Sequence, residues 1–488
     1  MDGLTSALLD IFAFPNALLL MLGVALGVIV GAIPGMNGAV LDGLLVSLTY
    51  GMEAESAMVL LVSMYVGSVS GGLLTATLLR MPGTPASMMT TLDGYPMACS
   101  GQPGRALGLG VSSSLVGGVT SWFFLILLAK PIAVASHQLG SFDMFSLVLV
   151  ALVMIASVSG KSLVLGLLSG LIGMLVSLPG ESAATGRVRL TFGIHALDAG
   201  FNLLPVLIGL FAISQIINDI LKIDEPFEKT AGDSRGAWKC LLEWKHSFNL
   251  LRSSLIGTFV GLLPGIGANI GSVMAYSAAQ NSSQHPEKFG TGSEEGIVAS
   301  EAANNATVGG ALIPLVSMGI PGSVIDAILL GALILHGLQP GPKLMDTNPQ
   351  VVYMIMATML VANIFMALFM LGTLGWLTKL MYVPRRILLP LILVFCVVGS
   401  YALNNRAFDV WVMLGFGLLG FGMERLRIPL APFVIGFVLA PIAEKNLATG
   451  LQATGGSYVP LVTSPASLVF LIVALIFFAW PLWRRRSR

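Results

Sequence analysis

The chain has 488 residues, of which 55% are hydrophobic and only 10% are charged, and its mean hydropathy is +0.88. Soluble domains carry about 25% charged residues, so this composition excludes an ordinary soluble protein and predicts an all-α polytopic integral membrane protein. A formal net charge of +1 without a basic patch excludes a nucleic-acid-binding protein.

Apolar runs of spanning length recur along the whole chain, and a transmembrane helix needs about 20 such residues. We expect spans near residues 14–33, 55–79, 105–128, 142–158, 161–179, 201–219, 252–278, 294–319, 351–379, 386–400, 405–423, 429–443 and 466–483. Segments 34–49, 82–92 and 321–338 are too short or too interrupted to cross alone, which predicts re-entrant or broken helices. The expected total is about 11 to 13 transmembrane helices.

The basic residues indicate how the chain is oriented. No Lys or Arg precedes Arg80, whereas the chain ends in Trp483-Arg484-Arg485-Arg486-Ser487-Arg488. The positive-inside rule therefore predicts a cytoplasmic C-terminus and an external N-terminus. Ends on opposite sides of the membrane imply an odd number of full spans.

The longest charged stretch begins at Lys222 and has charges of both signs interspersed, which is typical of a solvated linker. We expect three parts on this basis. Residues 1–221 form a first transmembrane repeat half, residues 222–247 a polar cytoplasmic linker, and residues 248–488 a second transmembrane repeat half with a basic cytoplasmic tail.

Three glycine-containing elements recur in the same order in both halves. In the first half they are GAIPG from Gly31, then Gly71-Gly72, then the turn from Pro82. In the second half they are GLLPG from Gly261, then Gly309-Gly310, then the turn from Pro321. The spacing from Gly71 to Pro82 is eleven residues and that from Gly309 to Pro321 is twelve. This order predicts an internal duplication, and an odd number of spans per repeat would make the repeats inverted, as we expect.

The two Pro-Gly-hydroxyl turns are candidates for substrate binding. Proline ends a helix, glycine permits a turn and a hydroxyl caps the next helix, whose first N–H groups suit a carboxylate. A kink or a tight packing contact is the alternative for the pair. The candidate substrate-binding residues are those of the two turns and the asparagines that follow the two earlier Pro-Gly pairs: Pro82, Gly83, Thr84, Pro321, Gly322, Ser323, Asn37 and Asn269.

A second polar set lies in the run EAANNAT, which begins at Glu301. Side-chain amides coordinate sodium or hydrogen-bond a carboxylate, and they also bond across helices with no further role. We assign Glu301, Asn304, Asn305 and Thr307 to a cation or to the substrate. Acids are costly in a bilayer, which makes Glu301 and Asp326 candidates for an ion or proton site.

Long stretches of the sequence resemble the large membrane subunit of the tripartite tricarboxylate transporters. They are GAIPGMNGAVLDGLLVSLTYGM at 31–52, MPGTPASMMTTLDGYPMACSGQPGRALG at 81–108, and the whole of 261–342. The runs PGTPAS, DGYPMA, HPEKFG, EAANNA, GIPGS and LHGLQPGP are specific in combination. The resemblance extends through both halves and most of the chain.

This resemblance implies the translocating subunit of a binding-protein-dependent secondary transporter, multi-pass in the bacterial inner membrane. Its partners would be a small four-helix membrane subunit and a periplasmic solute-binding protein. It would import a tricarboxylate or dicarboxylate by symport with Na⁺ or H⁺ and by alternating access. No cofactor is expected, and no metal beyond a transported Na⁺. The sequence has no GxxxxGK[ST] phosphate loop that would bind ATP.

Two positions depart from the family pattern. Arg80 stands where the family commonly has a small polar residue such as Asn, and Asp42 occupies a place that is more often small or apolar. Arg80 either complements an anionic substrate or reaches the lipid headgroups from a helix end. These departures leave the carboxylate and the coupling ion open.

Two other functions compete with symport. A channel or exporter for organic anions that works without a binding protein is the alternative function. An intramembrane enzyme would need a nucleophile with a base, or a metal set, and neither HExxH nor HxxEH occurs in the sequence. We therefore expect no enzymatic activity.

Overall fold

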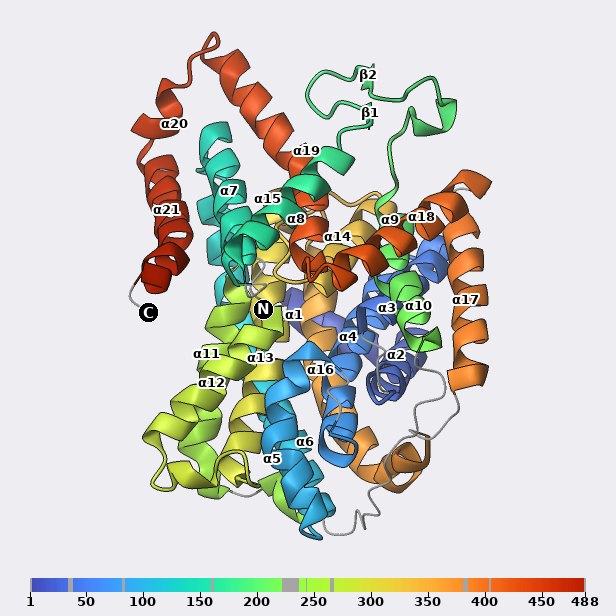
Figure 1. The fold of residues 1–488 in the computed structure, drawn as a ribbon, viewed down its shortest axis with the longest axis vertical. Coiled ribbons are helices and arrows are strands. Elements are labelled where there is room, and N and C mark those ends of the chain that lie inside the picture. The colour runs from blue at the N-terminus through green and yellow to red at the C-terminus, as the bar shows by residue number, and fades with distance from the viewer. Residues whose placement is uncertain are drawn as a thin grey trace.

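The computed structural model describes residues 2–33, 38–80, 84–158, 162–221, 237–242, 244–263, 267–380, 385–402 and 405–486 (Figure 1). Helices dominate this part of the chain. Its one sheet is the antiparallel pair β1 (Gly180–Glu181) and β2 (Val188–Arg189). The prediction of an all-α polytopic membrane protein is confirmed. Asn37, Pro82 and Gly83 lie outside the described residues.

The helices before the linker are α1 (Asp2–Ile11), α2 (Asn16–Gly31), α3 (Gly38–Leu48), α4 (Ala54–Leu78), α5 (Met88–Cys99), α6 (Pro103–Ser136), α7 (Ser141–Val158), α8 (Leu163–Val176), α9 (Leu203–Leu207) and α10 (Ser214–Ile220). A π-helix, Ile208–Ile213, joins the last two. Short 3-10 turns cover Thr49–Gly51, Pro85–Ser87, His195–Leu197, Ala237–Leu242, Trp244–His246 and Pro286–Lys288.

The helices after the linker are α11 (Ser247–Leu262), α12 (Gly267–Ser282), α13 (Glu294–Met318), α14 (Val324–Leu335), α15 (Pro342–Thr347), α16 (Pro349–Leu380), α17 (Arg385–Ala402), α18 (Ala407–Arg425), α19 (Leu430–Ala453), α20 (Val459–Thr463) and α21 (Pro465–Arg486). The single span expected near 252–278 is two helices, because α11 ends at Leu262 and α12 begins at Gly267. Helix α1, which the sequence did not predict, precedes α2 at a bend of 73°.

Six helices of the described chain are long and apolar enough to cross a membrane, or seven if α1 and α2 form one bent span. The six are Ala54–Leu78, Pro103–Ser136, Leu203–Ile220, Pro349–Thr378, Ala407–Arg425 and Leu430–Ala453. Several shorter apolar helices lie among them, including α14 and parts of α7 and α21. The total of 11 to 13 spans and the odd parity stay predictions.

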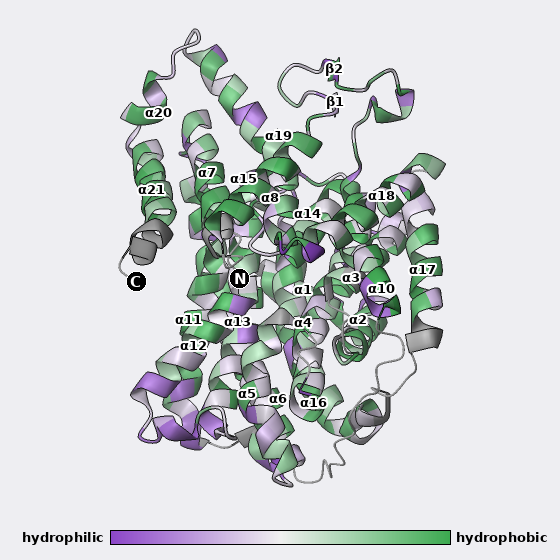
Figure 2. Ribbon diagram, in the orientation of Figure 1, coloured by the Kyte–Doolittle hydropathy of each residue, from purple (hydrophilic) through white to green (hydrophobic). Residues whose placement is uncertain are grey.

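The outer faces of several helices expose large apolar side chains, as expected for helices that contact lipid. Phe123 and Leu127 of α6 are exposed, and so are Trp411 and Leu418 of α18. Figure 2 shows mostly hydrophobic helices through the body of the molecule and hydrophilic residues gathered at the end where α12 and α13 are joined. A soluble monomer rarely exposes so much apolar surface, so the protein spans a membrane several times.

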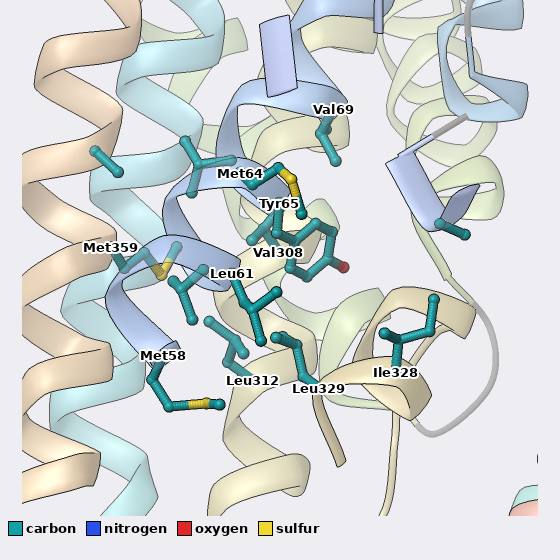
Figure 3. Packing of buried hydrophobic residues seen from close by; sticks show 14 of the residues in the cluster. Met58, Leu61, Met64, Tyr65, Val69, Val308, Leu312, Ile328, Leu329 and Met359 are labelled. Atoms are coloured by element: carbon teal, nitrogen blue, oxygen red, sulfur yellow. The ribbon is translucent and has the colours of Figure 1, made fainter. Parts of the chain in front are cut away.

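Helices α4 and α13 form the centre of the molecule. Each has 25 residues, and nearly all of them are buried. Figure 3 shows Met58, Leu61 and Tyr65 of α4 beside Val308 and Leu312 of α13. Other helices surround both, so polar side chains in their middle turns cannot reach bulk water.

The same close backbone crossing occurs twice, once on each central helix. A Cβ atom on Gly71 of α4 would lie 2.5 Å from the carbonyl oxygen of Val28 and 3.0 Å from the Cα atom of Gly31. A Cβ atom on Gly310 of α13 would lie 2.3 Å from the carbonyl oxygen of Thr258 and 3.1 Å from the Cα atom of Gly261. Small residues at such crossings let helix backbones touch.

This crossing corrects the alignment of the two halves. Gly31 corresponds to Gly261, and Gly71 corresponds to Gly310 rather than Gly309. The spacing to the following Pro-Gly turn is then eleven residues in both halves. Helix lengths agree in the same order: α2 and α11 have 16 residues, α5 and α14 have 12, and α7 and α17 have 18. The boundary at 222–247 stays a prediction.

Polar contacts join the halves at one end of the molecule. Buried Asp93 of α5 accepts hydrogen bonds from the backbone N–H groups of Gly290, Gly292 and Ser293 at 2.8, 3.0 and 2.8 Å, and from the Tyr276 hydroxyl at 2.8 Å. These bonds hold the loop before α13 against α5.

An ion-pair cluster lies beside that loop. Glu294 at the start of α13 pairs with Arg105 of α6 at 2.5 Å, with His246 at 3.0 Å and with Lys245 at 3.3 Å. Lys245 and His246 belong to the segment 222–247 that the sequence predicts as the linker, so the cluster lies on the linker side of the protein. We call the Asp93 and Glu294 contacts together the end clamp.

Replacing Gly310 by Ala should destabilise the protein, because the new methyl group would overlap the Thr258 carbonyl unless α11 and α13 separate. Overpacking of this kind costs about 1–3 kcal/mol, and the melting temperature of the purified protein in detergent measures it. The matched control is Gly375→Ala in α16, where a Cβ atom has no neighbour within 4 Å. The control should melt at the wild-type temperature or above it. Equal melting temperatures of the Gly310→Ala and Gly375→Ala variants would contradict the close contact of α11 and α13 at Gly310.

Candidate functional site

A buried polar cluster surrounds the middle of α13. Asn305, 1% exposed, accepts a hydrogen bond at Oδ1 from the Ser70 hydroxyl of α4 at 2.6 Å. Its Nδ2 donates to the Ser114 hydroxyl of α6 at 2.7 Å and to the Glu301 carbonyl at 3.2 Å. The amide therefore joins α13 to two helices of the first half.

Glu301 lies one turn before Asn305 and is completely buried. The Thr90 hydroxyl of α5 donates to its Oε1 atom at 2.5 Å, and the Ser114 hydroxyl lies 3.4 Å from its Oε2 atom. Among the described residues no basic side chain pairs with this carboxyl group. A buried carboxylate without a counter-charge is costly, so the position favours a bound cation or a proton.

Asn304 is the incompletely bonded member of the cluster. Its Nδ2 atom reaches the Val69 carbonyl at 3.5 Å, while its buried Oδ1 atom has no hydrogen-bond partner within the described part of the chain. Thr307 donates to the Asn304 backbone carbonyl at 2.6 Å. Buried polar atoms in native proteins are nearly always bonded, so the Asn304 oxygen is available to a cation or to a donor on a ligand.

The turn at Pro321 and Gly322 closes α13 and starts α14. Gly319 ends α13 in the left-handed conformation at φ 71°. A Cβ atom on Gly322 would lie 2.7 Å from the Cβ atom of Ala311, so only glycine fits against α13 there. The Ser323 hydroxyl caps α14 by accepting from the Asp326 N–H group at 3.3 Å, as the sequence predicts.

The Thr84 turn differs from its counterpart. The Thr84 hydroxyl bonds the Ser87 hydroxyl at 2.9 Å, and α5 begins only at Met88 after a 3-10 turn. Thr84 therefore does not cap the next helix, contrary to expectation. It packs against α4, because a Cβ atom on Gly72 would lie 3.2 Å from both its backbone N and its Oγ1 atoms.

The two turns approach the same central helix at different heights. Thr84 lies beside Gly72 of α4, and the Ser323 hydroxyl lies 3.2 Å from the Tyr65 hydroxyl of the same helix. Tyr65 and Gly72 are seven residues apart in α4, so their Cα atoms are about 10 Å apart along the axis. The Ser70 contact to Asn305 lies between them in the sequence of α4.

Other predicted residues have different surroundings. Asn269 lies on α12 with its side chain exposed. Arg80 is exposed at the end of α4, and its guanidinium group stacks on the Tyr95 ring at 5.7 Å from the ring centre. Among the described residues no group of three or more His, Cys, Asp or Glu side chains is arranged to hold a metal ion.

Sequence reasoning missed Ser70, Thr90, Ser114 and Tyr65, which supply the partners of the predicted residues. One signal was available for Ser70. Helix α4 carries five serines or threonines that are completely buried, namely Ser63, Ser68, Ser70, Thr75 and Thr77. Hydroxyl residues repeated in an apolar span indicate bonds between helices.

The fold and the polar centre define a polytopic membrane protein built to hold polar groups at membrane depth. The match to the tripartite tricarboxylate transporter TctA family covers residues 17–435, so the chain belongs to that transporter family. No solved structure matches the chain.

Two relatives come from Agrobacterium vitis. An uncharacterized 52.8 kDa protein in the TAR-I ttuC' 3' region is 32% identical over 463 residues, which cover 94% of this chain and 92% of the relative. An uncharacterized protein in the TAR-II ttuC' 3' region is 35% identical over 220 residues, which cover 45% of this chain and 91% of the relative. The first similarity extends through both halves.

Replacing Asn305 by Leu should destabilise the protein by about 1–3 kcal/mol, because the Ser70 and Ser114 hydroxyls lose a buried partner. Thermal melting in detergent measures the loss. In a protein that already carries Asn305→Leu, the further change Ser70→Ala should lower the stability by less than Ser70→Ala does in the wild type.

Asn446→Leu is the control for this prediction, since Asn446 donates to the Ile442 carbonyl within its own helix. It should cost less than Asn305→Leu. A Ser70→Ala effect that is the same in both backgrounds would mean that the two side chains do not interact.

Proposed function

We propose that this chain is the translocating subunit of a secondary transporter that imports a di- or tricarboxylate with a cation, Na⁺ or H⁺, across the bacterial inner membrane. One observation carries this proposal furthest. Where α4 and α13 meet, residues of both halves form a buried polar cluster that includes an unbonded amide oxygen. Membership in a tripartite transporter family supports the same function.

The paired backbone crossings support an internal duplication. Gly71 on Val28 and Gly310 on Thr258 occupy equivalent positions, and each central helix leads into a Pro-Gly-hydroxyl turn eleven residues later. Transporters built from two repeats place their substrate at the repeat interface, near interrupted helices. In this proposal the interface is where α13 of the second half meets α4 and α6 of the first half.

The carboxylates of the substrate would be held at the two turns. Helix α14 begins next to Ser323, so the N–H groups of its first turn present partial positive charge there. Thr84 supplies the hydroxyl of the other turn. Pro82, Gly83 and Asn37 belong to this proposed substrate site by their positions in the sequence, together with Pro321, Gly322 and Asn269.

Cation binding would accompany the substrate. Glu301 and the Asn304 side-chain oxygen lie one turn apart on α13, and Asn305 and Thr307 continue the polar run. A bound cation offsets the negative charge of the substrate and lowers the cost of moving the loaded site through the membrane. Movement would then be favourable only when both are bound, which is the condition for symport.

Alternating access requires the end clamp to open. Asp93 and Glu294 tie α5 and α6 to the start of α13 on the linker side, which we expect to be cytoplasmic together with the C-terminus. Breaking these contacts would open the centre to the cytoplasm. A periplasmic solute-binding protein would deliver the substrate from the other side, and a small four-helix membrane subunit would complete the complex.

Uptake into proteoliposomes tests the proposal. The vesicles would contain this chain with its small membrane partner, the binding protein would be added outside, and sodium and proton gradients would be imposed separately. Accumulation of a labelled di- or tricarboxylate that needs both the binding protein and one gradient is the expected result. Uptake that continues without either would favour the channel or exporter.

A Thr84→Ala, Ser323→Ala double variant should lose about tenfold or more in uptake, since each hydroxyl contributes about 1 kcal/mol. The control is Thr120→Ala with Thr373→Ala, two hydroxyls that donate to carbonyls of their own helices. The control should transport like the wild type, and melting temperatures should show that both proteins fold. Wild-type uptake by the turn variant would count against the turns as the substrate site.

A further inference from the structure

Two acidic side chains lie outside the central cluster, deep in the protein. Asp42 of α3 and Asp326 of α14 are both 0% exposed, and no carboxylate oxygen of either makes a hydrogen bond of normal geometry within the described chain. The hydroxyl and N–H groups of Ser323 are donors beside the Asp326 carboxyl group, whereas Asp42 has none beside it among the described residues. The other buried acids differ from them: Asp93 accepts from three backbone N–H groups, and Asp409 accepts from the Asn202 amide at 3.1 and 3.2 Å.

Helices α3 and α14 lie side by side and run in the same direction. A Cβ atom on Gly38 would lie 3.2 Å from the Cδ1 atom of Ile325 at their starts. At their ends, Nε2 of His336 lies 3.1 Å from the Thr49 hydroxyl. In this register Asp42 lies about one helical turn further along the pair of helices than Asp326, and the charge of Asp326 acts on the Asp42 carboxyl group.

The Tyr65 hydroxyl lies near the pair and bonds to the turn at Ser323. Tyr65 is close enough to feel the charge of both carboxylates. Its hydroxyl lies 3.2 Å from the Ser323 hydroxyl, which in turn accepts from the N–H group of Asp326. Asp326, one member of the acidic pair, is therefore hydrogen-bonded to the turn at Ser323 through its backbone.

Some of the elements packed against α3 and α14 carry other charged or titratable groups. Helices α2 and α9 and the π-helix Ile208–Ile213 have none. The remaining elements carry Tyr50 after α3, Glu55 and Tyr65 on α4, Glu294, Glu295 and Glu301 on α13, His336 after α14, Arg385, Arg386, Cys396 and Tyr401 on α17, and Glu444 and Lys445 on α19. No basic residue of the described chain pairs with Asp42 or Asp326.

Two buried like charges that have no basic partner among the described residues, and donors from Ser323 beside only one of them, are too costly to persist. A positive charge between them removes the repulsion and supplies the missing partner. We propose that Asp42 and Asp326 hold the coupling cation, a proton or a sodium ion, next to the turn at Ser323. This inference rests on the proposed symport function and places its coupling cation at this acidic pair instead of at Glu301 and Asn304.

The bond between Asp326 and Ser323 gives such a site a direct influence on substrate binding. A cation draws the two carboxylates together and fixes α3 against the start of α14. The N–H group of Asp326 then keeps its hydrogen bond to the Ser323 hydroxyl. This bond keeps the first turn of α14 in place to bind an anion. Without a cation the carboxylates repel each other, and their negative charge opposes an anionic substrate at the neighbouring turn.

The test measures cation binding by the purified full-length chain, separately from transport. Radioactive sodium reports a bound ion, and the infrared carbonyl band of a protonated carboxyl group reports a bound proton. Asp42→Asn and Asp326→Asn should each remove the signal that the wild type gives, or weaken sodium affinity by about tenfold or more. Asp409→Asn, which changes a buried acid that already has a donor, should leave it unchanged.

Each outcome decides the proposal. Sodium binding lost in the Asp42 and Asp326 variants assigns a sodium site, and a protonated-carboxyl band lost in them assigns a proton site. A wild type with neither signal overturns the proposal even if a variant fails to fold, and so do signals that persist in both variants. If uptake is driven by a gradient but the cation signal is unchanged in the Asp42→Asn and Asp326→Asn variants, this site is rejected and the proposed function stands. If the chain binds a cation but takes up no carboxylate, the proposed function is rejected and the cation site stands.

Discussion

The structure depends on one constraint, which is that polar groups buried at membrane depth must find their partners inside the protein. Helix α13 illustrates it, because Glu301 and Asn305 lie where no water reaches and are bonded by hydroxyls of α4, α5 and α6. These bonds require close helices, and the glycine crossings at Gly71 and Gly310 bring the central backbones into contact with α2 and α11. Within the described chain Asn304 and Asp42 keep buried oxygens without a hydrogen-bond partner, and the proposed ligands would supply that partner.

Neighbouring side chains in the polar cluster differ in whether their polar groups bond to the protein or are left for a ligand. Asn305 uses all of its bonding groups on protein partners, so its position stabilises the contact of α13 with the first half. Asn304, its neighbour in the sequence, leaves an oxygen free. The Ser323 hydroxyl has two roles, because it caps α14 and also contacts Tyr65. Because Ser323 both starts α14 and bonds to Asp326, a cation at the proposed acidic pair would affect the turn proposed to bind the substrate.

Much of this organisation could be predicted from local sequence. Helix-breaking Pro-Gly pairs indicated where the helices are interrupted, and the polar run from Glu301 indicated the centre of α13. The unpredicted parts depend on contacts between distant segments. Nothing local pairs Asp42 with Asp326, or Ser70 with Asn305. Gly309 and Gly310 are adjacent glycines, so only the backbone crossing shows which one corresponds to Gly71.

The most direct test of the account is the affinity of the purified chain for a carboxylate substrate, measured by calorimetry at increasing sodium concentration and, separately, at decreasing pH. Coupling between two sites is reciprocal, so the account predicts that one of the two cations tightens carboxylate binding and that the carboxylate tightens binding of that cation by the same factor. Carboxylate affinity that is independent of both cations would contradict a symporter whose cation and substrate sites meet at Ser323.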